Sequence, residues 1–202
     1  MANWWLKRKT RTKKPKSAFR EYTEAIIIAL VLALVIRTFV VQAFKIPSGS
    51  MLPTLQIGDH ILVNKFIYRF QSPHRGDIIV FKYPRDEGRD FIKRVIGVPG
   101  DKLMIREKQV FINDRPLSEP YVIHTDPEIQ EAPYSPRDFY GPLIIPPGKY
   151  FMMGDNRDHS MDSRFWGLLD QDKIRGKAFL IYWSWDGERF RPRWERIGKL
   201  VR

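Results

Sequence analysis

The sequence contains no cysteine among its 202 residues. Disulfide bonds, thiolate metal sites and a cysteine nucleophile are therefore excluded, while the compartment stays open because cytosolic and exported proteins can both lack cysteine. Histidine is scarce as well, and the spacings of the four residues match no zinc-binding pattern. We accordingly expect neither a metal ion nor another cofactor.

Acidic residues are too few to balance the basic ones, and the net charge is +12. The surplus lies at the two ends: residues 1–24 carry a net charge of +6 and residues 171–202 one of +5, so the stretch between them is nearly neutral. Charge at the chain ends suits anionic lipid better than the groove of a nucleic-acid-binding domain. We therefore expect a lipid bilayer as a partner and no nucleic acid.

One long apolar run follows the basic start, from Ala25 to Ile36, and Arg37 and Gln42 interrupt its continuation to Phe44. A helix of this length would be about 30 Å long at about 1.5 Å per residue, close to the thickness of the hydrocarbon core. The long side chain of Arg37 can reach the headgroups from its place near one end. We predict a transmembrane anchor at residues 24–44.

Two other interpretations of this run are weaker. A cleavable signal peptide usually ends at a small-residue cleavage site, and residues 41–45 offer only a poor one. A buried soluble helix would be shorter or would carry a polar face. Because basic residues favour the cytoplasmic side, we predict a single-pass plasma-membrane protein with a cytoplasmic tail (1–23) and an extracytoplasmic domain (45–202).

No helix-length amphipathic stretch follows the anchor. Short β-rich runs bounded by Gly, Pro and Asn predict a mostly β domain, built as a barrel or as packed sheets. Residues 120–148 contain seven prolines and four acids, which indicates a loop-rich insertion with one candidate strand at 121–124. The basic end, 189–202, is interpreted as a surface tail or a lipid-facing patch. The other predicted strands are 60–66, 77–83, 91–98, 102–106, 109–113, 150–153 and 178–185.

Residues 47–59 hold two serines, two prolines and two glycines directly after the anchor. Such a segment is too broken for a helix and too rich in turn residues for an ordinary strand. A serine held on a constrained turn at a membrane surface is a candidate nucleophile. It needs a base to take its proton and donors to hold the oxyanion that forms.

Two kinds of base are considered for this serine. A Ser-His-Asp triad stays open, but nothing in the placement of the four histidines favours it. The other base is a lysine whose charged form is disfavoured by burial. Lys93 lies within the apolar run 91–98, where strand alternation turns either Lys93 or Arg94 inward. An edge strand with both charges in solvent is the alternative.

The acidic cluster of Asp155, Asp158 and Asp162 raises the question of calcium. An EF-hand needs acids or amides at alternate positions followed by glycine, and these places hold other residues here. A charged turn braced by Arg157 and Arg164 fits the pattern better.

Four blocks of sequence occur in a fixed order. They are Pro47-Ser-Gly-Ser-Met-Leu-Pro-Thr-Leu-Gln-Ile-Gly-Asp59, Arg75-Gly-Asp-Ile-Ile-Val-Phe81, Asp90-Phe-Ile-Lys-Arg-Val-Ile-Gly-Val-Pro-Gly-Asp101 and Met153-Gly-Asp-Asn-Arg-Asp-His-Ser-Met-Asp-Ser-Arg-Phe-Trp-Gly167. With the anchor, they make roughly residues 25–183 resemble the bacterial type I signal peptidases. These are membrane-bound Ser-Lys endopeptidases that remove signal peptides from exported preproteins. The ordered set is specific, whereas any one block alone is only suggestive.

The resemblance implies a role for each matching residue. Ser50 would be the nucleophile and Lys93 the general base, and the Ser48 hydroxyl would hold the oxyanion together with the Ser50 backbone N–H. Ser160 would orient the lysine amine by a hydrogen bond. Asp162, paired with Arg164, would support the site.

The resemblance also implies the substrate. Small pockets would admit alanine or similar residues at the first and third positions before the cut, so preprotein signal peptides with an Ala-X-Ala site are the expected partners. Some family members have two membrane spans, and this chain shows one. The residues that fall at the pocket positions are Ile46, Pro47, Met51, Leu55, Phe91 and Ile92.

Other functions remain open from the sequence. A specialised peptidase of the same clan could trim a pilus, conjugation or other dedicated substrate. Soluble self-cleaving repressors share the Ser-Lys chemistry, but the predicted anchor and the lack of a helix-turn-helix argue against one. A non-catalytic, membrane-tethered β domain that binds polypeptides or lipid is the alternative from another class.

Overall fold

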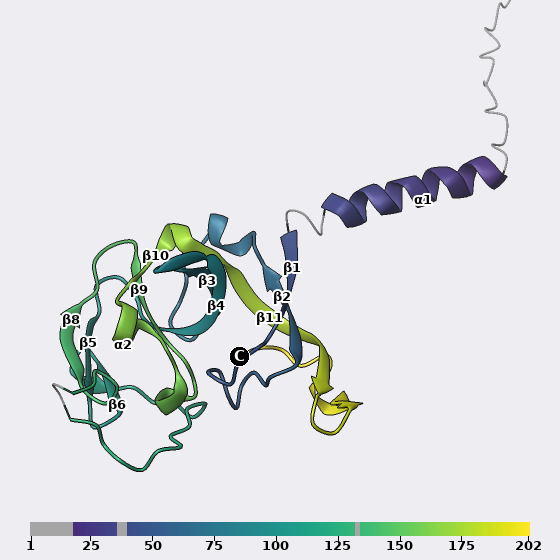
Figure 1. Cartoon of the computed structure of the whole chain (residues 1–202). Helices are drawn as coiled ribbons and strands as arrows, with labels where there is room; N and C mark the ends of the chain where they lie inside the picture. Colours follow the sequence, from purple (N-terminus) through teal and green to yellow (C-terminus); the bar gives the residue numbers. More distant parts are fainter. Residues whose placement is uncertain (1–17, 36–39, 132–133) are drawn as a thin grey trace, which may run out of the picture.

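Strands make up most of the computed structural model, which describes residues 18–35, 40–131 and 134–202. Helix α1 (Ala18–Val35) stands apart from the β domain (Figure 1). No helix in the described ranges combines the length and the apolar character needed to cross a membrane. The anchor predicted at 24–44 is therefore unconfirmed: residues 36–39 lie outside the described residues, and Val41–Lys45 is strand β1 and not the end of a helix.

All seven strands predicted outside the insertion are present; the strand at 102–106 has the predicted bounds, and the other six have shifted ends. In the insertion, residues 121–124 form no strand and contribute only an isolated bridge between Ile123 and Asn156, whereas 140–144 do form one. The remaining strands are β2 (Asp59–Asn64), β3 (Ile78–Tyr83), β4 (Asp86–Gly97), β5 (Lys102–Arg106), β6 (Gln109–Ile112), β7 (Arg115–Pro116), β8 (Tyr140–Ile144), β9 (Lys149–Met153), β10 (Leu169–Asp170), β11 (Ile174–Asp186) and β12 (Arg191–Pro192).

The strands form two antiparallel sheets. The large sheet has the order β1-β2-β11-β3-β4-β9-β10, with β12 paired to β11, and the small sheet has the order β7-β6-β5-β8. The large sheet runs from one edge strand to another without closing on itself, so the domain is a packed-sheet fold and not a closed barrel in the described part of the chain. Short helical turns, including α2 (Ser163–Trp166), connect the strands.

The burial patterns of β2 and β4 show how each strand contributes to the core. In β2 every second side chain is buried, as expected for a strand with one face on the core. In β4 the first five residues are exposed, while 93–97 are buried without alternation. The second half of β4 is covered on both faces, since Val95 belongs to one hydrophobic cluster and the next residue, Ile96, belongs to another. This covering determines the environment of the candidate site.

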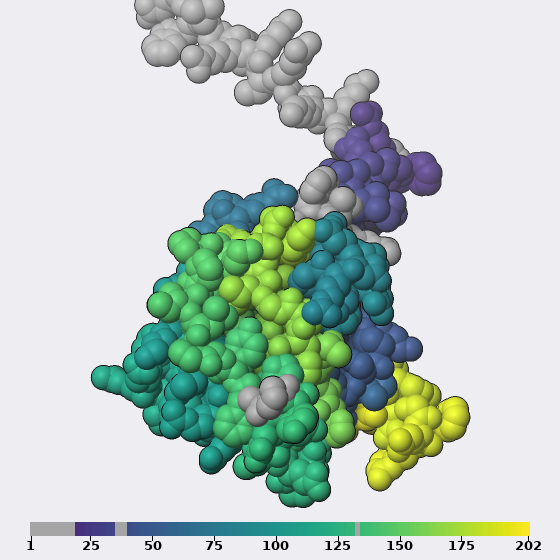
Figure 2. Space-filling view, turned by 60° about the vertical axis from the view of Figure 1, so that its left-hand side comes forward, coloured from purple at the N-terminus to yellow at the C-terminus, as the bar shows by residue number. Residues whose placement is uncertain are grey.

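One hydrophobic cluster connects the residues around Ser50 with the large sheet. Ile46, Met51 and Leu55 are at most 2% exposed and pack with Ile61 of β2 and Ile181 of β11. The apolar side chains of this turn-rich segment therefore hold it against the sheet. The segment follows β1 and lies beside the C-terminal residues on the molecular surface (Figure 2).

Candidate active site

The first of the four sequence blocks forms a closed loop, here called the Ser50 loop (residues 47–59). Its ends are joined by hydrogen bonds from Ile46 N to Asp59 O (2.8 Å) and from Gly58 N to Ile46 O (3.0 Å). Gly58 has φ +91°, and a Cβ atom there would lie 2.2 Å from the Trp185 carbonyl oxygen. Only glycine fits this close approach without strain. The turn predicted from the sequence is thus confirmed.

Ser50 of this loop contacts Lys93 of β4. Lys93 Nζ lies 2.7 Å from Ser50 Oγ, and the amine also donates to the carbonyl oxygen of Ile92 at 3.0 Å. Lys93 is 4% exposed and Ser50 9% exposed, so the contact is shielded from bulk water. Within the described chain no histidine hydrogen-bonds to the Ser50 hydroxyl, which leaves the Ser-His-Asp alternative without geometric support.

Burial shifts the protonation of Lys93. The loss of hydration disfavours the ammonium form and lowers the pKa of Lys93 from 10.5 to about 8, although the nearby carboxylates of Asp162 and Asp155 raise it and the Arg164 guanidinium lowers it further. The ring of Phe91 covers the amine, with its centroid 5.4 Å from Nζ. A neutral amine beside a serine hydroxyl is the arrangement that proton transfer from serine requires.

Arg94 is buried as deeply as Lys93, which alternation did not predict. Its guanidinium forms a two-pronged pair with Asp155, at 2.8 Å from Nε to Oδ1 and 2.7 Å from Nη2 to Oδ2. Thr54 of the Ser50 loop donates to the same carboxylate, and the Tyr121 ring stacks 3.8 Å from the guanidinium carbon. This pair attaches β4 and the fourth block to the loop that carries the serine.

The expected pair of Asp162 and Arg164 is present. Arg164 contacts both carboxylate oxygens at 2.8 Å, and the backbone N–H of Gly154 donates to Oδ2 at 3.1 Å. Burial alone would raise the pKa of Asp162, but the Arg164 charge and these hydrogen bonds hold it below its usual value. The carboxylate is therefore ionised and fixed close to Lys93.

Ser160 differs from its expected role. Its hydroxyl is buried and reaches hydrogen-bond geometry with no described residue. It makes no hydrogen bond to Lys93, whose amine is held by Ser50 and by the Ile92 carbonyl. Ser160 packs tightly against Gly154, where an added Cβ would lie 2.3 Å from Ser160 Oγ. Close packing thus brings it into the site without the predicted bond.

Asn156 joins the fourth block to the serine turn and was missed by sequence reasoning. Its backbone N–H donates to the Ser50 carbonyl oxygen at 3.2 Å, and its side-chain amide donates to the Gly49 carbonyl oxygen at 3.2 Å. The contact fixes the backbone on both sides of the serine N–H. The signal was weak, because an asparagine among the charged residues Asp155, Arg157 and Asp158 is typical of an ordinary turn.

Two hydrogen-bond donors near Ser50 are available for a ligand. The Ser50 backbone N–H donates to no described residue, and the Ser48 side chain is exposed with no hydrogen bond in the described chain. The turn therefore presents one backbone donor and one hydroxyl next to the nucleophile candidate. Donors in such a place are what an oxyanion requires.

The six residues expected to line substrate pockets divide into two sets. Ile46, Met51 and Leu55 belong to the core cluster and have almost no exposed surface, so they offer little direct contact to a ligand in this structure. The physical reason is that their apolar side chains hold the Ser50 loop against the sheet. The other three, Pro47, Phe91 and Ile92, retain exposed surface beside the Ser50–Lys93 contact.

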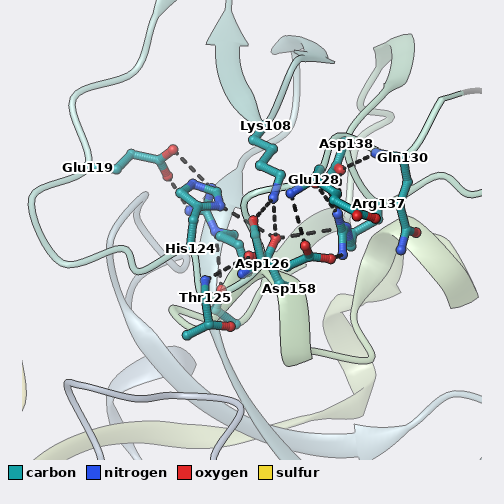
Figure 3. A network of polar contacts seen from close by, with 12 residues as sticks. Lys108, Glu119, His124, Thr125, Asp126, Glu128, Gln130, Arg137, Asp138 and Asp158 are labelled. Carbon is teal, nitrogen blue, oxygen red and sulfur yellow. Dashed lines mark hydrogen bonds and ion pairs between the residues drawn. The ribbon is translucent and has the colours of Figure 1, made fainter.

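The insertion is fastened to the fourth block by a buried ionic network (Figure 3). The fully buried Asp158 carboxylate accepts the backbone N–H groups of Thr125 (2.8 Å) and Asp126 (2.9 Å) and the Lys108 amine (3.1 Å). Burial alone would raise the pKa of Asp158, but these donors lower it to about 2. Arg137 pairs with Asp126 at 2.6 Å. The charged turn predicted around Asp158 is thus held by more partners than sequence reasoning named.

Comparison with known proteins identifies the family of the chain. A family model described as "Signal peptidase, peptidase S26" matches residues 19–183. The chain is 40% identical to a probable signal peptidase I-2 of Synechocystis sp., over 87% of this chain and 80% of the relative. It is 37% identical to a signal peptidase I of Bacillus amyloliquefaciens, over 88% and 95% respectively. A crystal structure of a signal peptidase I from Enterococcus faecalis V583 is 34% identical, with a TM-score of 0.43, over 53% of this chain and 97% of that one. The chain therefore belongs to the signal peptidase family, peptidase S26, which consists of serine endopeptidases.

Proposed function

We propose that the chain cleaves signal peptides from exported preproteins by a Ser-Lys mechanism. The observation that carries the proposal is the 2.7 Å contact between Ser50 Oγ and the buried Lys93 amine. Ser50 is the nucleophile and Lys93 the general base. These two residues carry out the proton transfer and the attack on the substrate, and no histidine is required.

The reaction begins with Lys93 in its neutral form. As Ser50 Oγ attacks the scissile carbonyl carbon, its proton passes to Lys93 Nζ, and the negative charge moves to the carbonyl oxygen. The Ser50 N–H and the Ser48 hydroxyl donate to that oxyanion. When the intermediate collapses, the C–N bond breaks and Lys93 returns its proton to the leaving amine. Water activated by Lys93 then hydrolyses the acyl-enzyme and regenerates Ser50.

The neighbouring residues keep the lysine in position. The Ile92 carbonyl accepts from the amine and limits its rotation, while Asp162 and Arg164 form a fixed charge pair next to it. Ser160 supports the site by close packing against Gly154, and not by the hydrogen bond expected from the sequence. A positioned base with a pKa near the working pH transfers protons efficiently.

Cleavage after small residues follows from the surroundings of Ser50. An extended substrate lies along the exposed parts of Pro47, Phe91 and Ile92, and its alternate side chains point at the protein. Met51 and Leu55 form the packed floor beneath this surface and leave little depth for a large side chain. Ala-X-Ala sites are therefore the preferred substrates.

Membrane attachment through α1 completes the proposal. Seven large apolar side chains between Ile26 and Leu34 are each more than half exposed, a surface that water disfavours and a bilayer covers. The basic residues that precede α1 favour a cytoplasmic N-terminus and a catalytic domain on the other side. Fractionation of cells after alkaline extraction tests this attachment: recovery of the chain in the supernatant would contradict it.

The catalytic assignment is tested with the full chain in detergent and a preprotein that carries an Ala-X-Ala site. Ser50→Ala and Lys93→Ala are each expected to abolish processing. Lys102→Ala removes an exposed lysine that pairs only with Asp114, and it is expected to process at the wild-type rate. Processing by both Ser50→Ala and Lys93→Ala would falsify the Ser-Lys assignment.

A further inference from the structure

We propose that Arg196 is a positioning residue for the reaction, which clamps the second half of the Ser50 loop and so keeps the Ser50 hydroxyl on Lys93. Arg196 ends the short helical turn η5 (Trp194–Arg196), in the C-terminal segment that sequence reasoning interpreted as a surface tail or lipid-facing patch. The inference rests on the proposed function and deepens it, because it gives this segment a part in the same site.

The clamp consists of a buried ion pair and a backbone contact. Arg196 Nε and Nη2 contact the Asp59 carboxylate at 3.0 and 2.6 Å, and Nη2 also donates to the Thr54 carbonyl oxygen at 2.9 Å. Asp59 is fully buried, and it accepts further hydrogen bonds from the Ser184 hydroxyl (2.7 Å) and the Gln56 backbone N–H (2.8 Å). One guanidinium thus fixes two points of the loop, five residues apart.

Arg196 and Asn156 hold opposite halves of the loop. Asn156 donates to the carbonyl oxygens of Gly49 and Ser50, while Arg196 reaches Thr54 and the loop end at Asp59. Figure 2 shows the C-terminal segment next to the residues that follow β1 on the molecular surface. Removal of Arg196 would leave the buried Asp59 carboxylate without this guanidinium and the Thr54 carbonyl oxygen without this donor. The other contacts of this half, such as that from Thr54 to Asp155, remain, so we expect a local shift of the loop and not its detachment.

The backbone that carries Arg196 is itself anchored to β11. Gly198 N donates to Ile181 O at 2.8 Å, Ile181 N to Lys199 O at 2.9 Å, and Val201 N to Phe179 O at 3.1 Å. The last residues therefore continue as a strand-like edge beside β11. A side chain based on such a fixed element can position a loop to the precision that catalysis needs.

Loosening the loop would act on the base as well as on the nucleophile. Met51 and Leu55 of the loop belong to the packed layer next to Ser50, and Lys93 depends on its burial for a neutral amine. Asp155, Asp162 and Arg164 are the charged groups that act on Lys93, and none of them changes when Arg196 is replaced. Water admitted beside the amine would raise the pKa of Lys93 and move the activity profile to higher pH.

The experiment compares full-length wild type with Arg196→Gln, Arg196→Lys and Arg191→Gln. The last variant is the matched control, because Arg191 lies on the same segment with an exposed side chain. We measure kcat and KM for preprotein cleavage from pH 6 to pH 10, expressed per folded molecule from melting curves of each variant. Arg196→Lys keeps a positive charge beside Asp59 but loses the planar guanidinium that contacts two groups at once, so its kcat should lie between those of wild type and Arg196→Gln.

The expected result is a fall in kcat of about 10- to 100-fold for Arg196→Gln, with little change in KM and an alkaline shift of the pH profile. If Arg196→Gln does not fold, the same readouts on Arg196→Lys decide. A kcat per folded molecule and a pH profile equal to those of Arg191→Gln would overturn the inference. Ser50→Ala in the same assay separates the two proposals. If Ser50→Ala still cleaves the preprotein, the Ser-Lys assignment fails. If Ser50→Ala is inactive and the Arg196 variants cleave like wild type, only the role of Arg196 is refuted.

Discussion

Replacement of Lys93 by methionine should abolish cleavage and at the same time stabilise the fold at neutral pH. Methionine has a similar length and no charge, so it can fill the same buried space without the cost of desolvating an ammonium group. Asp155 and Asp162 keep their own arginine partners, Arg94 and Arg164, so the substitution leaves neither carboxylate unpaired. Exchange of a buried charge for an apolar group of similar volume is often stabilising.

The pH dependence gives the size of the effect. The pKa of the Lys93 amine is 10.5 in the unfolded chain and about 8 in the folded protein. Between pH 8 and pH 10.5 the unfolded chain therefore binds more protons than the folded protein. Wild-type stability therefore rises with pH through this window. At about 1.36 kcal/mol per pKa unit, holding the amine in the fold costs about 3 kcal/mol below pH 8, and most of this cost is gone at pH 10. Lys93→Met has no such group and should lack this rise.

The assay is equilibrium unfolding in denaturant at pH 7 and pH 10, with Ser50→Ala as the inactive control that retains the lysine. From pH 7 to pH 10, wild type and Ser50→Ala should each gain about 2.5 kcal/mol relative to Lys93→Met. The hydrogen bonds lost from Lys93 lower the variant's stability equally at both pH values, so the difference between the two pH values isolates the buried charge. A stability difference that does not change with pH would refute the argument from burial.

Three further outcomes follow from the same structure. The value of kcat/KM should rise about tenfold between pH 7 and pH 9, because the neutral fraction of Lys93 rises from about 9% to about 91%. A flat pH profile, measured with the chemical step limiting, would contradict lysine as the base. Asp155→Asn leaves Arg94 buried beside a neutral amide and should lower the free energy of unfolding by about 3–5 kcal/mol, and a loss under about 1 kcal/mol would show that the pair is unimportant. Gly58→Ala should lower the melting temperature more than Gly148→Ala. Both glycines have positive φ, but an added Cβ would lie 2.2 Å from a carbonyl oxygen at Gly58 and within 4 Å of no atom at Gly148. Equal decreases in melting temperature would show that the backbone at Gly58 can move away from this oxygen at no cost.

The strands and the serine turn were predictable because their signals are local. Alternation in β2 and the apolar composition of β4 can be read from neighbouring residues, and the mixture of proline, glycine and serine in residues 47–59 favours only a turn. The pairing of Ser50 with Lys93 was inferred from resemblance, since no spacing rule links two residues 43 positions apart. That contact is present in the fold, and its catalytic role stays a proposal.

The features that were missed depend on partners far away in the chain. Burial of both Lys93 and Arg94 contradicts simple alternation, and the compensating carboxylate of Asp155 lies 61 residues beyond Arg94. Asn156 and Arg196 act through backbone carbonyl oxygens, which every residue has, so no pattern in the sequence marks them. Met51 and Leu55, which the resemblance places at pocket positions, are packed in the core, and their part in substrate binding stays a prediction.

The position of β11 in the large sheet has a consequence for the newly made chain. This strand (Ile174–Asp186) lies between β2 and β3, which are synthesised more than ninety residues earlier, so the sheet cannot be completed until almost the whole chain is available. Pairings of such long sequence separation also form slowly. Asn156 and Arg196 are also made well after the Ser50 loop that they bond, so we expect this loop to acquire its fixed geometry only after β11 and Arg196 have been synthesised.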